Sequence, residues 1–188
     1  MNSICVFLGS SPGNHPAYME TAAALGRELA ARSLTCVYGG SCTGLMNQLA
    51  ESALAAGGKV VGVTVQALKD REAFHKGLTE LHVLPTMHER KNLMVQFADG
   101  FVALPGGFGT LEEVLEVLTW AQLGFHKKPC GLLNIEGYFD SLLLFLDKAV
   151  TEGFIRWEHR NMLLESDSPE DMLRQMESYS VPEVEKWL

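Results

Sequence analysis

Three glycine-rich segments, at residues 9–13, 39–44 and 105–110, have the composition of anion-binding turns. Each follows a short apolar run and precedes a helical pattern. Glycine lets a ligand approach the backbone, and the N–H groups at a helix N-terminus attract negative charge. A tight turn between a strand and a helix also needs glycine, but three such segments together favour a phosphate site. The hydroxyls of Ser10 and Ser41 either contact phosphate or ribose there, or only brace the turns.

Two common nucleotide-binding motifs are missing from these segments. Gly39 and Gly44 have the spacing of a Walker loop, but Leu45 and Met46 stand where that loop needs lysine followed by serine or threonine. The third segment lacks the last glycine of a GxGxxG dinucleotide fingerprint. The sequence therefore favours a mononucleotide or a sugar phosphate as the ligand.

Charged residues stand at two of the expected helix starts. Residues 110–113 have the T-x-x-E pattern of a capping box, which is one explanation for Glu113. A carboxylate beside an anion site can instead position a hydroxyl or activate water. Residues 86–89 repeat the pattern, and Arg90 and Lys91 follow them. These cations are either solvated surface charges or groups that face an anion, a role that suits the forked guanidinium of Arg90.

Composition limits the class of protein. The chain has 188 residues, 47% of them hydrophobic and 20% charged, which predicts one folded domain over residues 1–188. The net charge of −8 argues against nucleic acid as a partner. No apolar run could span a bilayer and the four cysteines form no CxxC pair, so we expect a cytoplasmic protein with no membrane partner. The scattered histidines lack metal-ligand spacing, and we expect no metal.

Short apolar runs alternate with helical patterns along the chain. Strands are predicted at residues 3–8, 35–38, 60–65, 101–104 and 130–133, with 161–164 as an additional candidate. Helices are predicted at residues 17–32, 45–56, 87–98, 111–123, 138–152 and 169–179. Residues 66–81 are the least regular and are predicted to form a loop over the site. The alternation predicts an α/β, Rossmann-like, doubly wound and mostly parallel sheet with helices on both faces.

Two motifs resemble the paired signature of the LONELY GUY (LOG) family of cytokinin riboside 5′-monophosphate phosphoribohydrolases. They are MHERK at residues 87–91 and PGGFGTLEE at residues 105–113, and the similarity runs from Cys5 to about Glu165. The resemblance implies a Rossmann-like homodimer that cleaves the N-glycosidic bond of a nucleoside 5′-monophosphate without a cofactor. It places Arg90 and Glu113 at catalytic positions. The substrate-binding positions that it implies are Glu72, Lys91, Gly107, Phe108, Gly109, Thr110, Leu111, Glu112 and Thr119. Further candidate contacts are Ser10, Gly40, Ser41 and Met87.

Several alternatives stay open from the sequence. Glu113 either stabilises positive charge on the ribose or acts as a general base, and Arg90 holds the phosphate or orients the ribose and the leaving base. A carrier that binds a nucleotide or a pterin phosphate without turnover is the alternative function. The irregular residues 66–81 leave open whether a cytokinin nucleotide or plain AMP is preferred. The apolar residues 120–125 and 142–146 are core or subunit contacts, and we expect a homodimer.

Overall fold

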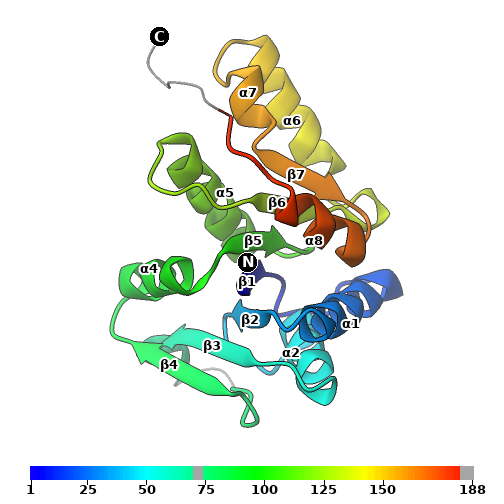
Figure 1. Cartoon of the computed structure of the whole chain (residues 1–188), viewed down its shortest axis with the longest axis vertical. Coiled ribbons are helices and arrows are strands. Elements are labelled where there is room, and N and C mark those ends of the chain that lie inside the picture. Colours follow the sequence, from blue (N-terminus) through cyan, green and yellow to red (C-terminus); the bar gives the residue numbers. More distant parts are fainter. Residues whose placement is uncertain (70–73, 183–188) are drawn as a thin grey trace.

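The computed structural model describes residues 1–69 and 74–182, and this part of the chain contains one seven-stranded sheet (Figure 1). The strands are β1 (Ser3–Phe7), β2 (Thr35–Tyr38), β3 (Val60–Val65), β4 (Glu80–Leu84), β5 (Gly100–Ala103), β6 (Cys130–Leu133) and β7 (Leu163–Ser166). They lie in the order β4-β3-β2-β1-β5-β6-β7, and each adjacent pair is parallel. The predicted Rossmann-like α/β fold is confirmed.

Helices cover both faces of the sheet. They are α1 (Pro16–Ala31), α2 (Gly44–Ala55), α3 (Gln66–Lys69), α4 (Met87–Phe97), α5 (Phe108–Gln122), α6 (Asp140–Thr151), α7 (Trp157–Arg160) and α8 (Pro169–Glu177), with a short 3-10 helix, η1 (Ile135–Gly137). Side chains of α1, α2 and α8 share one buried core with the sheet, and those of α4, α5 and α6 share the other. Figure 1 shows α1 and α2 packed against each other.

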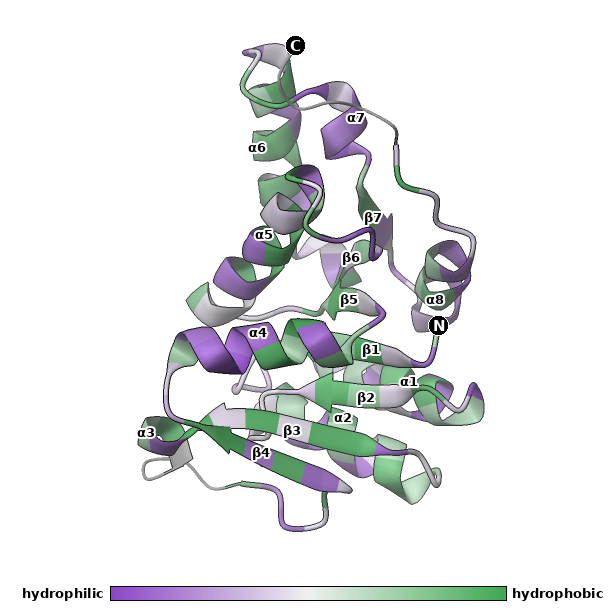
Figure 2. Ribbon diagram, turned by 60° about the vertical axis from the view of Figure 1, so that its left-hand side comes forward, coloured by the Kyte–Doolittle hydropathy of each residue, from purple (hydrophilic) through white to green (hydrophobic). Residues whose placement is uncertain are grey.

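Alternating side chains on each strand fill these two cores. On β1, Ile4 and Val6 pack with α1 and α2, whereas Cys5 and Phe7 pack with α4 and α5. All four are at most 3% exposed. A strand that is apolar on both sides is what a parallel sheet between two helical layers requires. In Figure 2 most of β3 and part of β2 are correspondingly green.

The segment between β3 and α4 differs from the prediction. The sequence predicts one irregular loop over residues 66–81, but α3 follows β3 directly and β4 begins at Glu80. β4 lies at the edge of the sheet, and its residues are exposed or half-buried. It therefore lacks the apolar run by which the inner strands are recognised. The additional candidate strand is present as β7, two residues later than predicted, and α7 is not predicted at all.

The start of α5 also differs, and the difference changes the interpretation of Glu113. The helix begins at Phe108, with Gly107 as its N-cap, and not at residue 111. Thr110 is therefore the third residue of the helix, and its side chain is buried against Gly106. The capping-box explanation for residues 110–113 is wrong. Glu113 lies in the second turn of α5, where its side chain has a different partner.

The direction of chain progression across the sheet changes at β1. β2, β3 and β4 lie on one side of this strand, and β5, β6 and β7 on the other. Because the strands are parallel, their carboxyl ends meet at one edge, and ligands of such sheets bind where the order reverses. The glycine segments that follow β1 and β5 meet at this point. The N–H of Gly9 donates to the carbonyl oxygen of Pro105 at 3.1 Å.

We expect that Gly44, the first residue of α2, is required for the close contact between the start of this helix and the glycine segment that follows β1. Its φ is +52°, and a Cβ there would lie 2.4 Å from the carbonyl oxygen of Ser10. Gly44→Ala should lower the free energy of unfolding by about 2–3 kcal/mol, because left-handed strain adds to a backbone clash. Urea unfolding measures this loss. Gly57→Ala is the matched control: Gly57 has a φ of +79° but open space around it, so only the strain of about 1 kcal/mol applies. Equal losses in the two variants would contradict the steric explanation.

Candidate functional site

A buried ion pair joins α4 to α5. The Nη1 atom of Arg90 lies 2.7 Å from Oε1 of Glu113, and the two side chains are 9% and 13% exposed. Charges withdrawn from water are costly unless they are paired, and each member of such a pair alters the proton affinity of the other. Because arginine stays protonated in proteins, Glu113 is the member of the pair that can exchange a proton.

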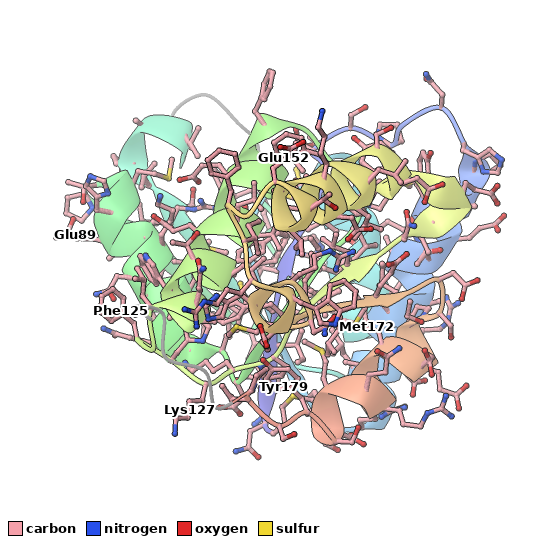
Figure 3. All side chains as sticks on the ribbon, turned by 90° about the horizontal axis from the view of Figure 1, so that it is seen from above. Glu89, Phe125, Lys127, Glu152, Met172 and Tyr179 are labelled. Atoms are coloured by element: carbon pink, nitrogen blue, oxygen red, sulfur yellow. The ribbon has the colours of Figure 1, made fainter. Side chains whose placement is uncertain are left out.

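Arg90 is fixed by contacts on several sides. α4 begins with the capping box that the sequence predicts, in which Thr86 and Glu89 each accept a hydrogen bond from the other's N–H group. Figure 3 shows Glu89 at the outer edge of the molecule. One turn into the helix, Nε of Arg90 donates to the carbonyl oxygen of Val63 at 3.0 Å. Gly39 borders the guanidinium, since a Cβ there would lie 3.1 Å from Nη2. Arg90 is thus a buried, oriented group, and the explanation as a solvated surface charge does not apply to it.

The surroundings of Glu113 suit a group that exchanges protons. Burial raises the pKa of Glu113 above its ordinary value, and the Arg90 guanidinium opposes this effect. A carboxylate whose pKa is raised toward neutrality can accept a proton in one step and release it in another.

Lys91 binds two further carboxylates of α5. Its Nζ atom lies 2.6 Å from Oε1 of Glu112 and 2.8 Å from Oε1 of Glu116. Burial disfavours the charged form of Lys91, but its hydrogen bonds to the two carboxylates outweigh burial and raise the pKa. Sequence reasoning missed Glu116, although its spacing of four residues from Glu112 places both on one face of a helix. In Figure 2, α4 is purple over much of its length.

A cleft of about 340 Å³ opens at the carboxyl edge of the sheet, between the glycine segment that follows β1 and the one that follows β5. Its walls include Ser10 from the segment after β1, Gly106 and Gly107 from the segment after β5, and the rings of Tyr18 and Tyr138. Gly107 is also the N-cap of α5, and it has no side chain with which to cap the helix. The first N–H groups of a helix have no intrahelical acceptor, so those of α5 are available to an anion.

The sequence matches known proteins over most of its length. A family model described as "Possible lysine decarboxylase" matches residues 46–176. The chain is 48% identical over 183 residues to cytokinin riboside 5′-monophosphate phosphoribohydrolase LOG1 of Arabidopsis thaliana, covering 97% of this chain and 85% of that protein. The chain belongs to the LOG family. A rice relative, cytokinin riboside 5′-monophosphate phosphoribohydrolase LOG of Oryza sativa subsp. japonica, is 46% identical, with 97% of this LOG-family chain and 75% of the relative covered.

Solved structures share the fold of this LOG-family chain. The molybdenum cofactor binding protein of Rippkaea orientalis has a TM-score of 0.71 at 24% identity, with 94% of this chain and 96% of that chain covered. The Moco carrier protein of Chlamydomonas reinhardtii has a TM-score of 0.70 at 19% identity, with 94% and 98% covered. At these identities the likeness concerns the fold alone.

Most of the predicted LOG-family site residues lie on α4, on α5 or at the cleft. Arg90, Glu113, Lys91 and Glu112 form the ion pairs described above, and Ser10 and Gly107 line the cleft. The Sδ atom of Met87 is 3.5 Å from Nη1 of Arg90. In the first turns of α5, Phe108 and Gly109 are exposed, Leu111 is half-buried and Thr110 is buried.

Gly40, Ser41 and Thr119 neither line the cleft nor join the ion pairs. Ser41 is 2% exposed and its hydroxyl shares a hydrogen bond with Thr43, while the carbonyl oxygen of Gly40 accepts from the N–H of His75. Thr119 donates to a carbonyl oxygen of its own helix and lines a separate cavity of about 110 Å³ between α5 and α7. Glu72 lies outside the described residues. The roles given to these residues stay predictions.

Proposed function

We propose that the protein hydrolyses the N-glycosidic bond of a nucleoside 5′-monophosphate and releases the free base and ribose 5-phosphate. The names of relatives at 46–48% identity support this activity. The observation that carries the proposal is the buried pair of Arg90 and Glu113, because Glu113 lies on α5, the helix that begins at the glycine cleft. Glu113 lies six residues beyond Gly107, which is about 9 Å along the helix axis. A carrier needs the cleft, whereas hydrolysis also needs a carboxylate such as Glu113 to act on water and on the ribose.

In the proposed reaction, the phosphate binds the N–H groups in the first turn of α5, and the ribose extends toward Glu113. Water attacks C1′ while the bond from C1′ to the base nitrogen breaks. Glu113 takes a proton from the water, and its negative charge stabilises the positive charge that develops on the ribose. The departing base takes up a proton from the solvent and leaves, and Glu113 then releases to the solvent the proton that it took from water. The mechanism requires no metal and no cofactor.

Arg90 has two roles in this proposal. Its positive charge favours the ionised form of Glu113, which burial alone would disfavour. Its guanidinium, fixed by Val63 and Glu113, orients the ribose or the leaving base with donors that these two partners do not use. Lys91 contributes a second cation to the site, held by Glu112 and Glu116.

Incubation of the purified protein with AMP and, separately, with isopentenyladenosine 5′-monophosphate tests the activity. Chromatography should show free base and an equal amount of ribose 5-phosphate from at least one of them, and the ratio of the two kcat/KM values gives the preference. A folded protein that returns both nucleotides intact would overturn the proposal. Stoichiometric binding without cleavage would favour the carrier.

We further propose that the 188-residue chain forms one domain and acts as a cytoplasmic homodimer. Within the described residues, no helix is both long enough and apolar enough to cross a membrane. Large apolar side chains are exposed around α6 and α7, and exposed patches of this kind mark interfaces. They are Leu144, Phe145, Phe154 and Trp157, with exposed fractions of 59–86%. Phe125, after the end of α5, is 74% exposed, and Figure 3 shows it at the edge of the molecule.

Light scattering tests the homodimer. At micromolar concentration we expect a mass of about 41 kDa, twice the 20.7 kDa of the chain. Replacement of Phe145 and Trp157 by serine should shift the mass toward that of the monomer, because it removes much of the apolar contact area. A wild-type mass of about 21 kDa would contradict the homodimer.

A further inference from the structure

The turn between β6 and α6 is strained, and it ends at Tyr138. Glu136 has a φ of +53°, in a region that side chains rarely adopt, and Gly137 follows with a φ of +67°. The positive φ of Gly137 would strain any residue with a Cβ, so the turn favours glycine at this position. Strained backbone persists where its surroundings impose it, and it is concentrated at functional sites.

This turn presents the hydroxyl of Tyr138 to the glycine segment that follows β5. The hydroxyl donates to the carbonyl oxygen of Gly106 at 2.6 Å. The Tyr138 ring meets the rings of Tyr18 and Phe139 edge-on, with centroid separations of 5.8 and 5.0 Å. These contacts fix the ring, so the hydroxyl has a defined direction.

The hydrogen bond at Gly106 determines where the next N–H points. In a trans peptide, the C=O of one residue and the N–H of the next point in opposite directions, and the described chain has no cis peptide. With its carbonyl held by Tyr138, Gly106 directs the N–H of Gly107 away from Tyr138. Neither glycine has a Cβ, so sterics alone hardly restrict rotation of this peptide plane. The preceding peptide has a different anchor, the N–H of Gly9 on the oxygen of Pro105.

We infer that Tyr138 is a positioning residue for the phosphate of the substrate. Its hydroxyl holds the peptide between Gly106 and Gly107 so that the N–H of Gly107, the N-cap of α5, points toward the bound anion. The inference rests on the proposed function, which identifies that anion as a nucleoside 5′-monophosphate. Tyr138 acts through the backbone, so it affects binding of the phosphate and not the breaking of the C1′–N bond.

Tyr138→Phe tests the inference, because it removes the hydroxyl and keeps the ring. We expect Kd for inorganic phosphate and KM for the nucleotide to rise about threefold to tenfold, the range that one hydrogen bond supplies. The kcat should change less than twofold. Relaxation-dispersion NMR should detect new exchange on the μs–ms timescale at the amides of Gly106 and Gly107. The melting temperature should stay near that of the wild type, because Tyr138 is 44% exposed.

Thr151→Val is the control. Thr151 also donates its hydroxyl to a backbone carbonyl, that of Asp147, but neither residue lines the cleft or belongs to the predicted site. This variant should leave phosphate affinity and the amides of Gly106 and Gly107 unchanged.

Three results would overturn the inference about Tyr138. They are an unchanged Kd for phosphate in Tyr138→Phe, a fall in kcat without a change in Kd, and loss of the fold, which would make the hydroxyl a structural requirement. A wild-type protein that binds phosphate but releases no base would contradict the proposed function alone, since phosphate affinity and amide exchange are measured without turnover.

Discussion

Glu113→Gln is expected to give a folded protein that still binds AMP but turns it over at least about a hundredfold more slowly. The glutamine oxygen can accept the hydrogen bond of Arg90, so the packing between α4 and α5 is kept. The variant lacks the negative charge that stabilises the ribosyl cation and the basic group that takes a proton from water. Single-turnover kinetics and a thermal melt measure the two effects separately.

Glu89→Gln provides the control for this variant. Glu89 is a carboxylate on α4, one residue from Arg90, but its side chain caps the helix and glutamine fills that position equally well. It should retain full turnover. If Glu113→Gln also retains full turnover, Glu113 has no part in the mechanism, and the carboxylate would have to be sought at Glu112 or Glu72.

Arg90→Met is expected to reduce turnover at neutral pH by on the order of a hundredfold or more and to change its pH dependence. Burial already raises the pKa of Glu113, and Arg90 is the group that counteracts it. A base must be ionised, so wild-type activity falls as the pH drops through the raised pKa of Glu113, above its ordinary value. Without Arg90 that pKa rises further, and the acidic limb of the profile moves to higher pH. Part of the lost activity should therefore return in alkaline buffer.

The pH profile of kcat/KM measures this shift, and Arg90→Lys is its control. Lysine keeps the positive charge near Glu113 but cannot donate to both Val63 and Glu113 with the geometry of a guanidinium. Its acidic limb should stay near that of the wild type while its turnover is reduced. If Arg90→Met leaves the acidic limb in place, Arg90 does not control the ionisation of Glu113.

Much of the fold could be predicted because the inner strands are apolar on both faces. β2, β3 and β6 have the bounds that their apolar runs predict. The start of α5 differs from its prediction because T-x-x-E is a local signal, whereas the burial of Thr110 against Gly106 is set by tertiary packing. The sequence does not predict β4, because apolar and polar residues are mixed in it.

The candidate site could be predicted as a set of residue types but not as an arrangement. Arg90 and Glu113 were found from their motifs, yet nothing in a linear sequence states that side chains 23 residues apart form one ion pair. The same holds for Lys91, whose partners lie on another helix. The packing of α4 and α5 on one face of the sheet decides which residues form the ion pairs and which line the cleft.

The mixed pattern of β4 has a consequence for solubility. The outer edge of a terminal strand exposes N–H and C=O groups with which another chain can pair, and such pairing leads to aggregation. β4 carries Glu80 and His82, whose side chains lie 3.0 Å apart, and His82 also packs edge-on against Phe97. A second strand added to this edge would have to bring its own side chains alongside that charged carboxylate. The polar residues that make β4 hard to recognise thus oppose the pairing of another chain with this edge of the sheet.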